Sequence, residues 1–240
     1  MMKEGFWSAV SRHPFGVLLL ALFFMLVFSP SISLLENYIP GFHGMAALAP
    51  LSLLVVAASM LTLWKRAKHH ARHMVAGALV IALLMLSSAV PHRLLIPIQL
   101  VIQILFLCYV MGIVARTVFK AKTVTGDILC GAISVYLMVG VLAGLVFVLI
   151  EYCSPGSFRV SNWTGDSVAQ QASFIREPGW LFYFSFVTLT TVGYGDVLPA
   201  SALARSAAVL VAVIGQVLLV VQVATLVGMH VVQRSTDSKK

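Results

Sequence analysis

Residues 190–196, Thr-Thr-Val-Gly-Tyr-Gly-Asp, have the types and spacing needed to build a cage of backbone carbonyl oxygens. Carbonyl groups that point in succession at one axis need backbone dihedrals of alternating hand, and Gly193 and Gly195 adopt positive φ without a Cβ penalty. The hydroxyl of Thr191 can add one more oxygen at the end of the run. Stacked oxygens of this kind replace the hydration shell of K⁺, so we expect this segment to hold that ion.

The flanking residues predict how the run is held in place. Val192 and Tyr194 would point away from the axis and pack against surrounding protein. Before the run, the aromatic and apolar segment 179–190 predicts a helix that starts after Glu177-Pro178. A helix of about three turns is too short for a bilayer of about 30 Å. It can re-enter and stop halfway, where its C-terminal dipole favours a cation.

After the run, Leu198-Pro199 breaks the chain and a long apolar segment, 201–232, predicts a membrane-spanning helix. Arg205 and Gly215 lie within it, ten and twenty residues after Gly195.

Across about residues 178–230 these features resemble the pore of tetrameric potassium channels, with a TVGYG filter followed by Asp. Both offsets match that family, which implies an arginine near the start of the inner helix and a hinge at Gly215. We therefore expect a Gly215→Ala change to alter gating and leave selectivity intact. The resemblance further implies that K⁺ is held by the backbone carbonyls of Thr191, Val192, Gly193 and Tyr194.

Composition indicates a membrane protein. Hydrophobic residues make up 60% of the chain and charged residues 10%, and the mean hydropathy is +0.99, far from the soluble average of about 25% charged. Apolar runs of roughly the spanning length predict six transmembrane helices, at 14–35, 45–64, 74–90, 94–115, 128–150 and 201–232. The first run resembles a signal peptide but lacks a small-x-small cleavage site, so we expect a retained helix.

The basic residues predict the orientation. Most of those near the ends of the expected spans fall on one side, namely Lys3, Arg12, Lys65, Arg66, Lys68, Arg72, Arg116, Lys120, Lys122, Arg234, Lys239 and Lys240, whereas the opposite side holds Arg93, Glu36 and the mixed-charge segment 151–179. The positive-inside rule places the basic side, and with it both termini, in the cytoplasm. The net charge of +8 is then explained by anionic lipid headgroups, with no need for nucleic acid.

One filter segment per chain cannot close a ring of carbonyls, so the sequence predicts a homotetramer with fourfold symmetry. The expected fold is an all-α membrane protein with six transmembrane helices, one re-entrant pore helix and an extended filter per subunit. Residues 1–122 would form a four-helix module, 123–232 the pore domain and 233–240 a short cytoplasmic tail. Within the pore domain we expect an outer helix at 128–151, an external loop at 152–178, a pore helix at 179–190, the filter at 191–196 and an inner helix at 201–232.

Several residues are candidates for filter support. By resemblance, Tyr183 would hydrogen-bond Asp196, with packing in an aromatic cuff as the alternative, and Thr190 belongs to the same support. Glu151 closes the outer helix where some relatives carry a glutamate that ties to the pore loop, although a solvated helix-end charge is the alternative. Val187 occupies the position where some bacterial channels carry a carboxylate, so filter inactivation is expected to differ from theirs.

A stripe on the inner helix is the candidate pore lining. Gln216, Leu219 or Val220, Val223, Val227 and Val231 follow one helical face from Gly215. In this interpretation Gln216 faces a wet cavity and the valines form a hydrophobic constriction. The alternative is that the stripe faces lipid or packs on the outer helix.

The expected voltage sensor lacks its charges. The fourth span, 94–115, contains Gln99 and Gln103 but no Arg or Lys, whereas each gating charge is worth about 2.3 kcal/mol per 100 mV. We therefore expect weak or absent intrinsic voltage dependence. The histidines of loop 65–73 could sense pH or a metal but fit better as a basic anchor, and the tail offers no room for a ligand-binding domain.

The remaining signals concern location. Cys108 and Cys130 fall inside spans, and Cys153 lies on the expected external side, as a free thiol or an intersubunit bridge. Asn162-Trp163-Thr164 is a glycosylation sequon that matters only in a eukaryote, and the compact plan indicates a prokaryotic plasma membrane.

Function classes follow from these observations. The leading interpretation is a passive K⁺ channel with no catalysis and no cofactor. The alternatives are a subunit of a potassium uptake system and a modulatory partner of another channel; the complete TVGYG argues against both.

Overall fold

The computed structural model describes residues 14–28, 53, 55–60, 75, 77–82, 95–121, 123–161 and 179–237. Most of the second and third expected spans lies outside these residues, as do loop 65–73 and the sequon at 162–164.

The described chain is mostly helical, with one short strand pair. Its elements are α2 (Pro14–Phe28), α6 (Leu95–Phe119), α7 (Gly126–Cys153), β1 (Phe158–Val160), α9 (Gly179–Leu189), β2 (Val197–Pro199) and α10 (Ala202–Asp237). Among the described residues, three stretches are long and apolar enough to cross a membrane: Ile96–Phe119, Gly126–Cys153 and Ala202–Ser235. Helix α2 is apolar but shorter, and α9 is a short apolar helix as the sequence predicts.

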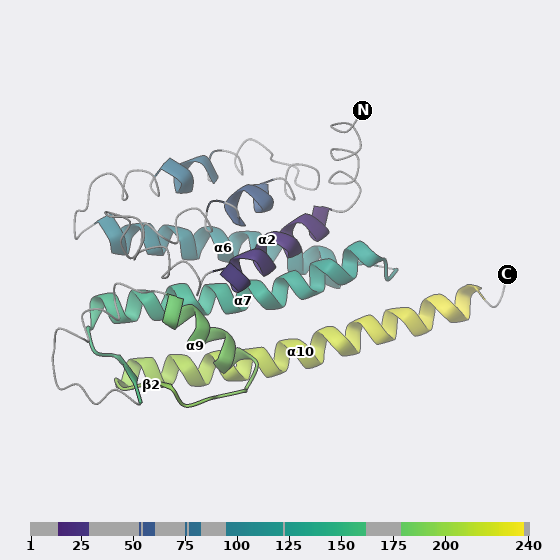
Figure 1. Ribbon diagram of the computed structural model, residues 1–240. Helices are drawn as coiled ribbons and strands as arrows, with labels where there is room; N and C mark the ends of the chain where they lie inside the picture. The colour runs from purple at the N-terminus through teal and green to yellow at the C-terminus, as the bar shows by residue number, and fades with distance from the viewer. Residues whose placement is uncertain are drawn as a thin grey trace.

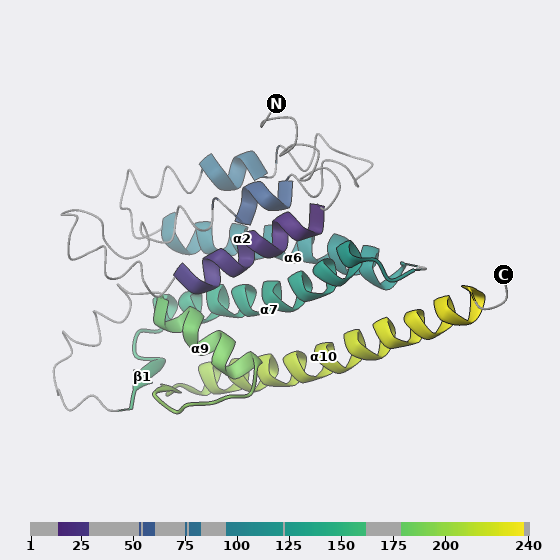
Figure 2. The ribbon, with the colours of Figure 1, turned by 45° about the vertical axis from the view of Figure 1, so that its right-hand side comes forward.

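Helix α7 is the centre of the fold. It contacts α6 and α2 on one side and α9 and α10 on the other (Figures 1 and 2). Helix α7 begins where Thr125, as N-cap, accepts a hydrogen bond from the backbone N–H of Ile128. Helix α9 lies between α7 and α10, which places the segment that follows it against α10.

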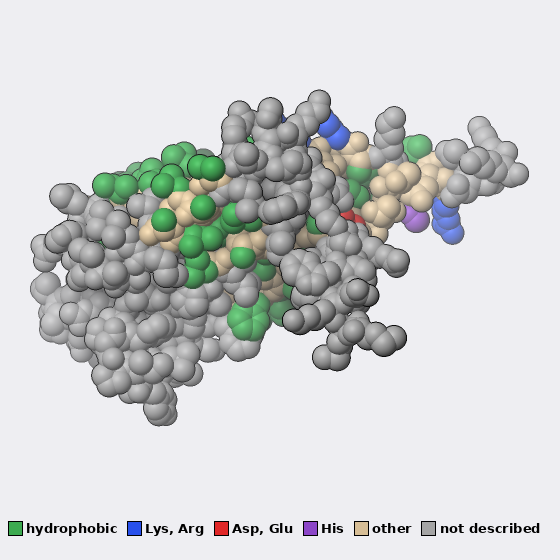
Figure 3. Space-filling model, turned by 90° about the horizontal axis from the view of Figure 1, so that it is seen from above, with side chains coloured by type: hydrophobic (Ala, Val, Ile, Leu, Met, Phe, Trp, Pro, Cys, Tyr) green, Lys and Arg blue, Asp and Glu red, His purple; other side chains and the backbone are tan. Residues whose placement is uncertain are grey.

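Two contacts define one end of the helices. The Asp127 carboxylate accepts a 3.1 Å hydrogen bond from the N–H of Phe15 at the start of α2. Near the end of α10, Gln233 Oε1 accepts from the N–H of Val124 at 3.2 Å. The starts of α2 and α7 and the end of α10 therefore lie together beside the connection between α6 and α7. On the face seen in Figure 3 the coloured basic side chains lie toward this end, and most of the coloured hydrophobic side chains lie toward the other.

At the opposite end of the helices, aromatic side chains pack α7, β1 and α9 together. Phe147 of α7, Phe158 of β1 and Phe184 of α9 form a triangle with ring centroids 5.2–5.5 Å apart. Such tilted and edge-on pairs stabilise beyond their buried area, so β1 and α9 are fixed to α7 by one cluster.

Several helices extend past the expected bounds. Helix α6 continues to Phe119, α7 covers 126–153 where 128–151 is expected, and α10 continues to Asp237 through most of the expected tail. Hydropathy marks where apolar side chains end, whereas a helix ends where its backbone hydrogen bonds end. The solvated polar residues after Val232 continue the helix beyond the apolar run.

Candidate functional site

Two glycines of α7 seat the short helix α9. A Cβ at Gly140 would meet the ring of Phe186, and one at Gly144 would lie 2.5 Å from Cδ1 of Phe182. Both pairs are spaced i, i+4, so the rings of α9 fill gaps that only glycine leaves, which is how small residues let membrane helices approach. The Ser185 hydroxyl locks this contact by donating to the Gly140 carbonyl at 2.8 Å.

The residues after α9 turn their N–H groups back toward it. Val192 and Gly193 both donate to the carbonyl oxygen of Val187, at 3.0 and 3.3 Å, Thr190 donates to Phe186 and Thr191 donates to Thr188. Val187 thus supports the expected filter segment, 191–196, through its backbone carbonyl, although it lacks the carboxylate that some bacterial channels carry at this position.

The backbone of this segment alternates in hand. Thr191, Gly193 and Gly195 have positive φ of 60°, 58° and 75°, and Thr191 is the one non-glycine residue with positive φ in the described chain. The sequence predicts positive φ at both glycines but not at Thr191, because a β-branched residue rarely adopts it. Left-handed residues at every second position bring successive carbonyls toward one side.

Tyr183 and Asp196 connect α9 to the end of the filter segment. The Tyr183 hydroxyl donates to Asp196 Oδ2 at 2.7 Å, the contact that the sequence leads us to expect, and the N–H of Val197 donates to Oδ1 at 2.9 Å. The ring of Tyr183 also stacks on that of Tyr194, with centroids 6.4 Å apart.

Glu151 supports the strand pair beside the filter. Its side chain is only 2% exposed, and its two oxygens accept from the N–H groups of Gly156 (2.7 Å) and Phe158 (2.9 Å). A solvated helix-end charge is therefore the wrong interpretation of this residue. Within the described chain its contacts are made to the turn before β1 and to the first residue of β1, and not to α9 or the filter segment.

Strand β1 connects Glu151 to the chain that follows the filter segment. It pairs antiparallel with β2, with Phe158 opposite Pro199 and Val160 opposite Val197. Beyond the pair, the N–H of Ser161 donates to the Asp196 carbonyl at 2.8 Å. The chain that leaves the filter is thus tied through β1 to the end of α7. No pattern in the sequence predicts these three-residue strands.

Gly215 lies where α10 passes the end of α9. An added Cβ would lie 2.5 Å from the carbonyl oxygen of Leu189 and 2.8 Å from its Cδ1. The same oxygen accepts from the Tyr136 hydroxyl at 3.2 Å. Helix α10 runs through this position without a break. Close packing against α9 is thus a function of Gly215 that the hinge interpretation does not include.

The candidate lining stripe lies on the unpacked side of α10. Gln216, Leu219, Val223, Val227 and Val231 are all exposed within one subunit, whereas Leu218, Gln222 and Leu226 face the core. Packing of the stripe on the outer helix of the same chain is therefore excluded. At the top of the stripe, Gln216 Nε2 donates to the Thr191 hydroxyl at 3.3 Å, which links the inner helix to the filter entrance.

Gln222 is a residue that sequence reasoning missed. It is buried, and its side-chain amide donates to the Ala132 carbonyl of α7 at 3.0 Å. A buried polar side chain in an otherwise apolar helix must find such a partner, and that isolated polarity was the available signal.

We expect the Tyr183→Phe change to destabilise the filter. It removes a hydrogen bond to a charged group, worth about 1.5–3 kcal/mol, so the mean open time in single-channel recordings should shorten about tenfold or more. Asp196→Asn is the partner for a double-mutant cycle. If the free-energy effects of Tyr183→Phe and Asp196→Asn simply added in the double mutant, the two side chains would have no coupling energy.

Comparison with known families supports an ion-channel function for the region from α7 to α10. Residues 135–231, from α7 to near the end of α10, match the model of a family described as an ion channel. Comparisons with curated proteins and with solved structures give no significant match. The matched segment contains α9, the filter segment and the strand pair, so passive ion conduction is the function that this region supports.

Proposed function

We propose that this protein is the pore-forming subunit of a potassium-selective channel. K⁺ would lose its hydration shell to the carbonyls of Thr191, Val192, Gly193 and Tyr194 and pass down its electrochemical gradient. The match of residues 135–231 to an ion-channel family supports conduction. Selectivity is the further step, and it rests on the filter segment.

The alternation of positive φ at Thr191, Gly193 and Gly195 is the observation that carries this proposal. The N–H groups of residues 190–193 are engaged on the α9 side. The alternating backbone then directs oxygens, not donors, toward the opposite side. Rings of carbonyl oxygens are the ligand set that K⁺ filters use.

Exposure of the filter and of α10 supports a homotetramer. Within one subunit, Val192 is 53% and Tyr194 71% exposed, although the filter requires their side chains to pack. The unpacked apolar side chains of α10 include Leu203, Val209, Leu210, Val213, Val217 and Val220. Neighbouring subunits around a fourfold axis would cover both. Gly215 as a gating hinge and the α10 stripe as pore lining belong to the same proposal.

We infer a multi-pass location in the plasma membrane of a prokaryote, with six spans and both termini cytoplasmic. Arg116, Lys120 and Arg234 lie at the end where α2 starts and α10 finishes, which supports this orientation. These cations would contact anionic headgroups.

The first test is the reversal potential of the purified protein in planar bilayers, with K⁺ on one side and Na⁺ on the other. We expect reversal near the K⁺ equilibrium potential. Because 94–115 carries no cation, current should persist at all voltages without steep activation. Reversal near zero would refute selectivity, and activation with several gating charges would refute the absence of a sensor.

A further inference from the structure

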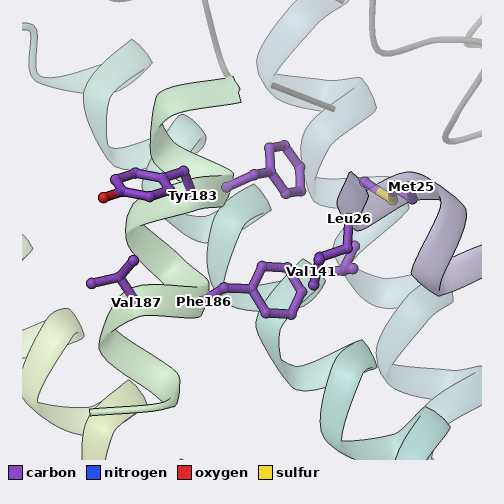
Figure 4. A pocket seen from close by; sticks show the side chains of 7 residues that line it. Met25, Leu26, Val141, Tyr183, Phe186 and Val187 are labelled. Atoms are coloured by element: carbon purple, nitrogen blue, oxygen red, sulfur yellow. The ribbon is translucent and has the colours of Figure 1, made fainter. Parts of the chain in front are cut away.

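A cavity of about 240 Å³ lies between α2, α7 and α9 (Figure 4). Its lining comes from three helices that are far apart in the sequence: Met25, Leu26, Val141, Phe182, Tyr183, Phe186 and Val187. Val141 lies near the middle of α7, a 28-residue span. The cavity is therefore at the depth of the hydrocarbon core.

The lining offers no suitable place for water. Its one polar side-chain atom, the Tyr183 hydroxyl, points away from the cavity in Figure 4 and is engaged by Asp196. The nearby Ser185 hydroxyl donates to the carbonyl of Gly140. A buried water needs two to four polar partners, whereas an apolar cavity of about 150 Å³ is large enough to bind benzene. The chemistry of the lining thus selects an apolar occupant.

The cavity also has an approach from the surface. Leu26, Tyr183 and Phe186 are half-buried, whereas Met25, Val141 and Phe182 are buried. The neighbouring Val27 on α2 is exposed. A flexible hydrocarbon chain in the bilayer can reach the cavity past the partly exposed side chains of α2 and α9.

Two lining residues are also filter supports. The Val187 carbonyl accepts from the N–H groups of Val192 and Gly193, and Tyr183 holds Asp196. We propose that this cavity is a binding site for the acyl chain of a membrane lipid, seated directly behind the filter. An occupant there packs against Phe182 and Phe186 of α9, the helix whose Val187 carbonyl and Tyr183 hydroxyl hold the filter segment.

Photolabelling tests the site without requiring current. The full-length protein is reconstituted with phosphatidylcholine that carries a diazirine on its acyl chain, illuminated, digested and mapped. We expect adducts on Met25, Leu26 and Phe182. In Leu26→Trp the indole fills the cavity, so the yield on α9 should fall about tenfold.

Val27→Trp is the matched control, because it adds the same side chain one position along α2 at an exposed site. In this variant the lipid should label α9 to the same extent as in the wild-type protein. Wild-type adducts confined to other surfaces, or α9 labelling unchanged in Leu26→Trp, would refute the site. The wild-type map decides the matter even if Leu26→Trp fails to fold. Loss of K⁺ selectivity with intact labelling would refute the proposed function and leave this site standing.

Discussion

A Gly195→Ala protein is expected to lose K⁺ current. Gly195 has φ of 75°, and an L-residue in that left-handed region costs about 1–2 kcal/mol. Four copies share one axis in the proposed tetramer, so the conducting arrangement becomes about 4–8 kcal/mol less favourable, which makes it at least about a thousandfold rarer. Flux of ⁸⁶Rb⁺ into liposomes measures the loss.

The cost at Gly195 is conformational, because no described residue of the subunit lies within 4 Å of the added Cβ. The matched control is Gly112→Ala in α6, where the added Cβ also meets no described residue within 4 Å and φ is not positive. It should conduct normally. Normal selective flux through Gly195→Ala would remove the basis of the carbonyl filter.

A Gly215→Ala protein is expected to lose selectivity as well as normal gating. The new Cβ would lie 2.5 Å from the Leu189 carbonyl oxygen, a backbone atom two residues before Thr191, so α9 or α10 must shift. Overpacking of this kind costs about 1–3 kcal/mol per site. This contact changes the expectation, drawn from a hinge alone, that selectivity would be intact. Reversal potentials in mixed K⁺ and Na⁺ measure it.

Gly228→Ala supplies the comparison on the same helix. Its Cβ would meet none of the residues that the structure describes within 4 Å, and alanine favours a helix over glycine by about 1 kcal/mol. This variant should keep selectivity. If Gly215→Ala changed only opening and closing while reversal stayed at the K⁺ potential, the hinge would be the whole function of that glycine.

The sequence predicts the local features of the site. The contact from Tyr183 to Asp196 is expected only from the resemblance to potassium-channel pores. The turn chemistry of Gly193 and Gly195 and the short helix before them depend on residues that are close together in the chain. Their patterns are visible because backbone freedom and helix length are set locally. The positive φ of Thr191 is an exception, because residue type opposes it and the hydrogen bonds to α9 impose it.

Contacts between distant segments leave no such pattern. The pairing of β1 with β2 joins residues about forty positions apart through backbone groups that every residue carries. The seating of Phe182 and Phe186 on Gly140 and Gly144 is equally hidden, because membrane helices are apolar on all faces and hydrophobicity does not mark their interfaces.

The short connection between α6 and α7 has a consequence for mixed assemblies. Residues 120–125 can extend at most about 20 Å, and Val124 within them bonds Gln233 near the end of α10. A displacement of α6 therefore reaches the inner helix of its own subunit. Consider a tetramer assembled from wild-type chains and chains mutated in the four-helix module, residues 1–122. We expect the change in gating to increase by one quarter of its full size for each mutated chain.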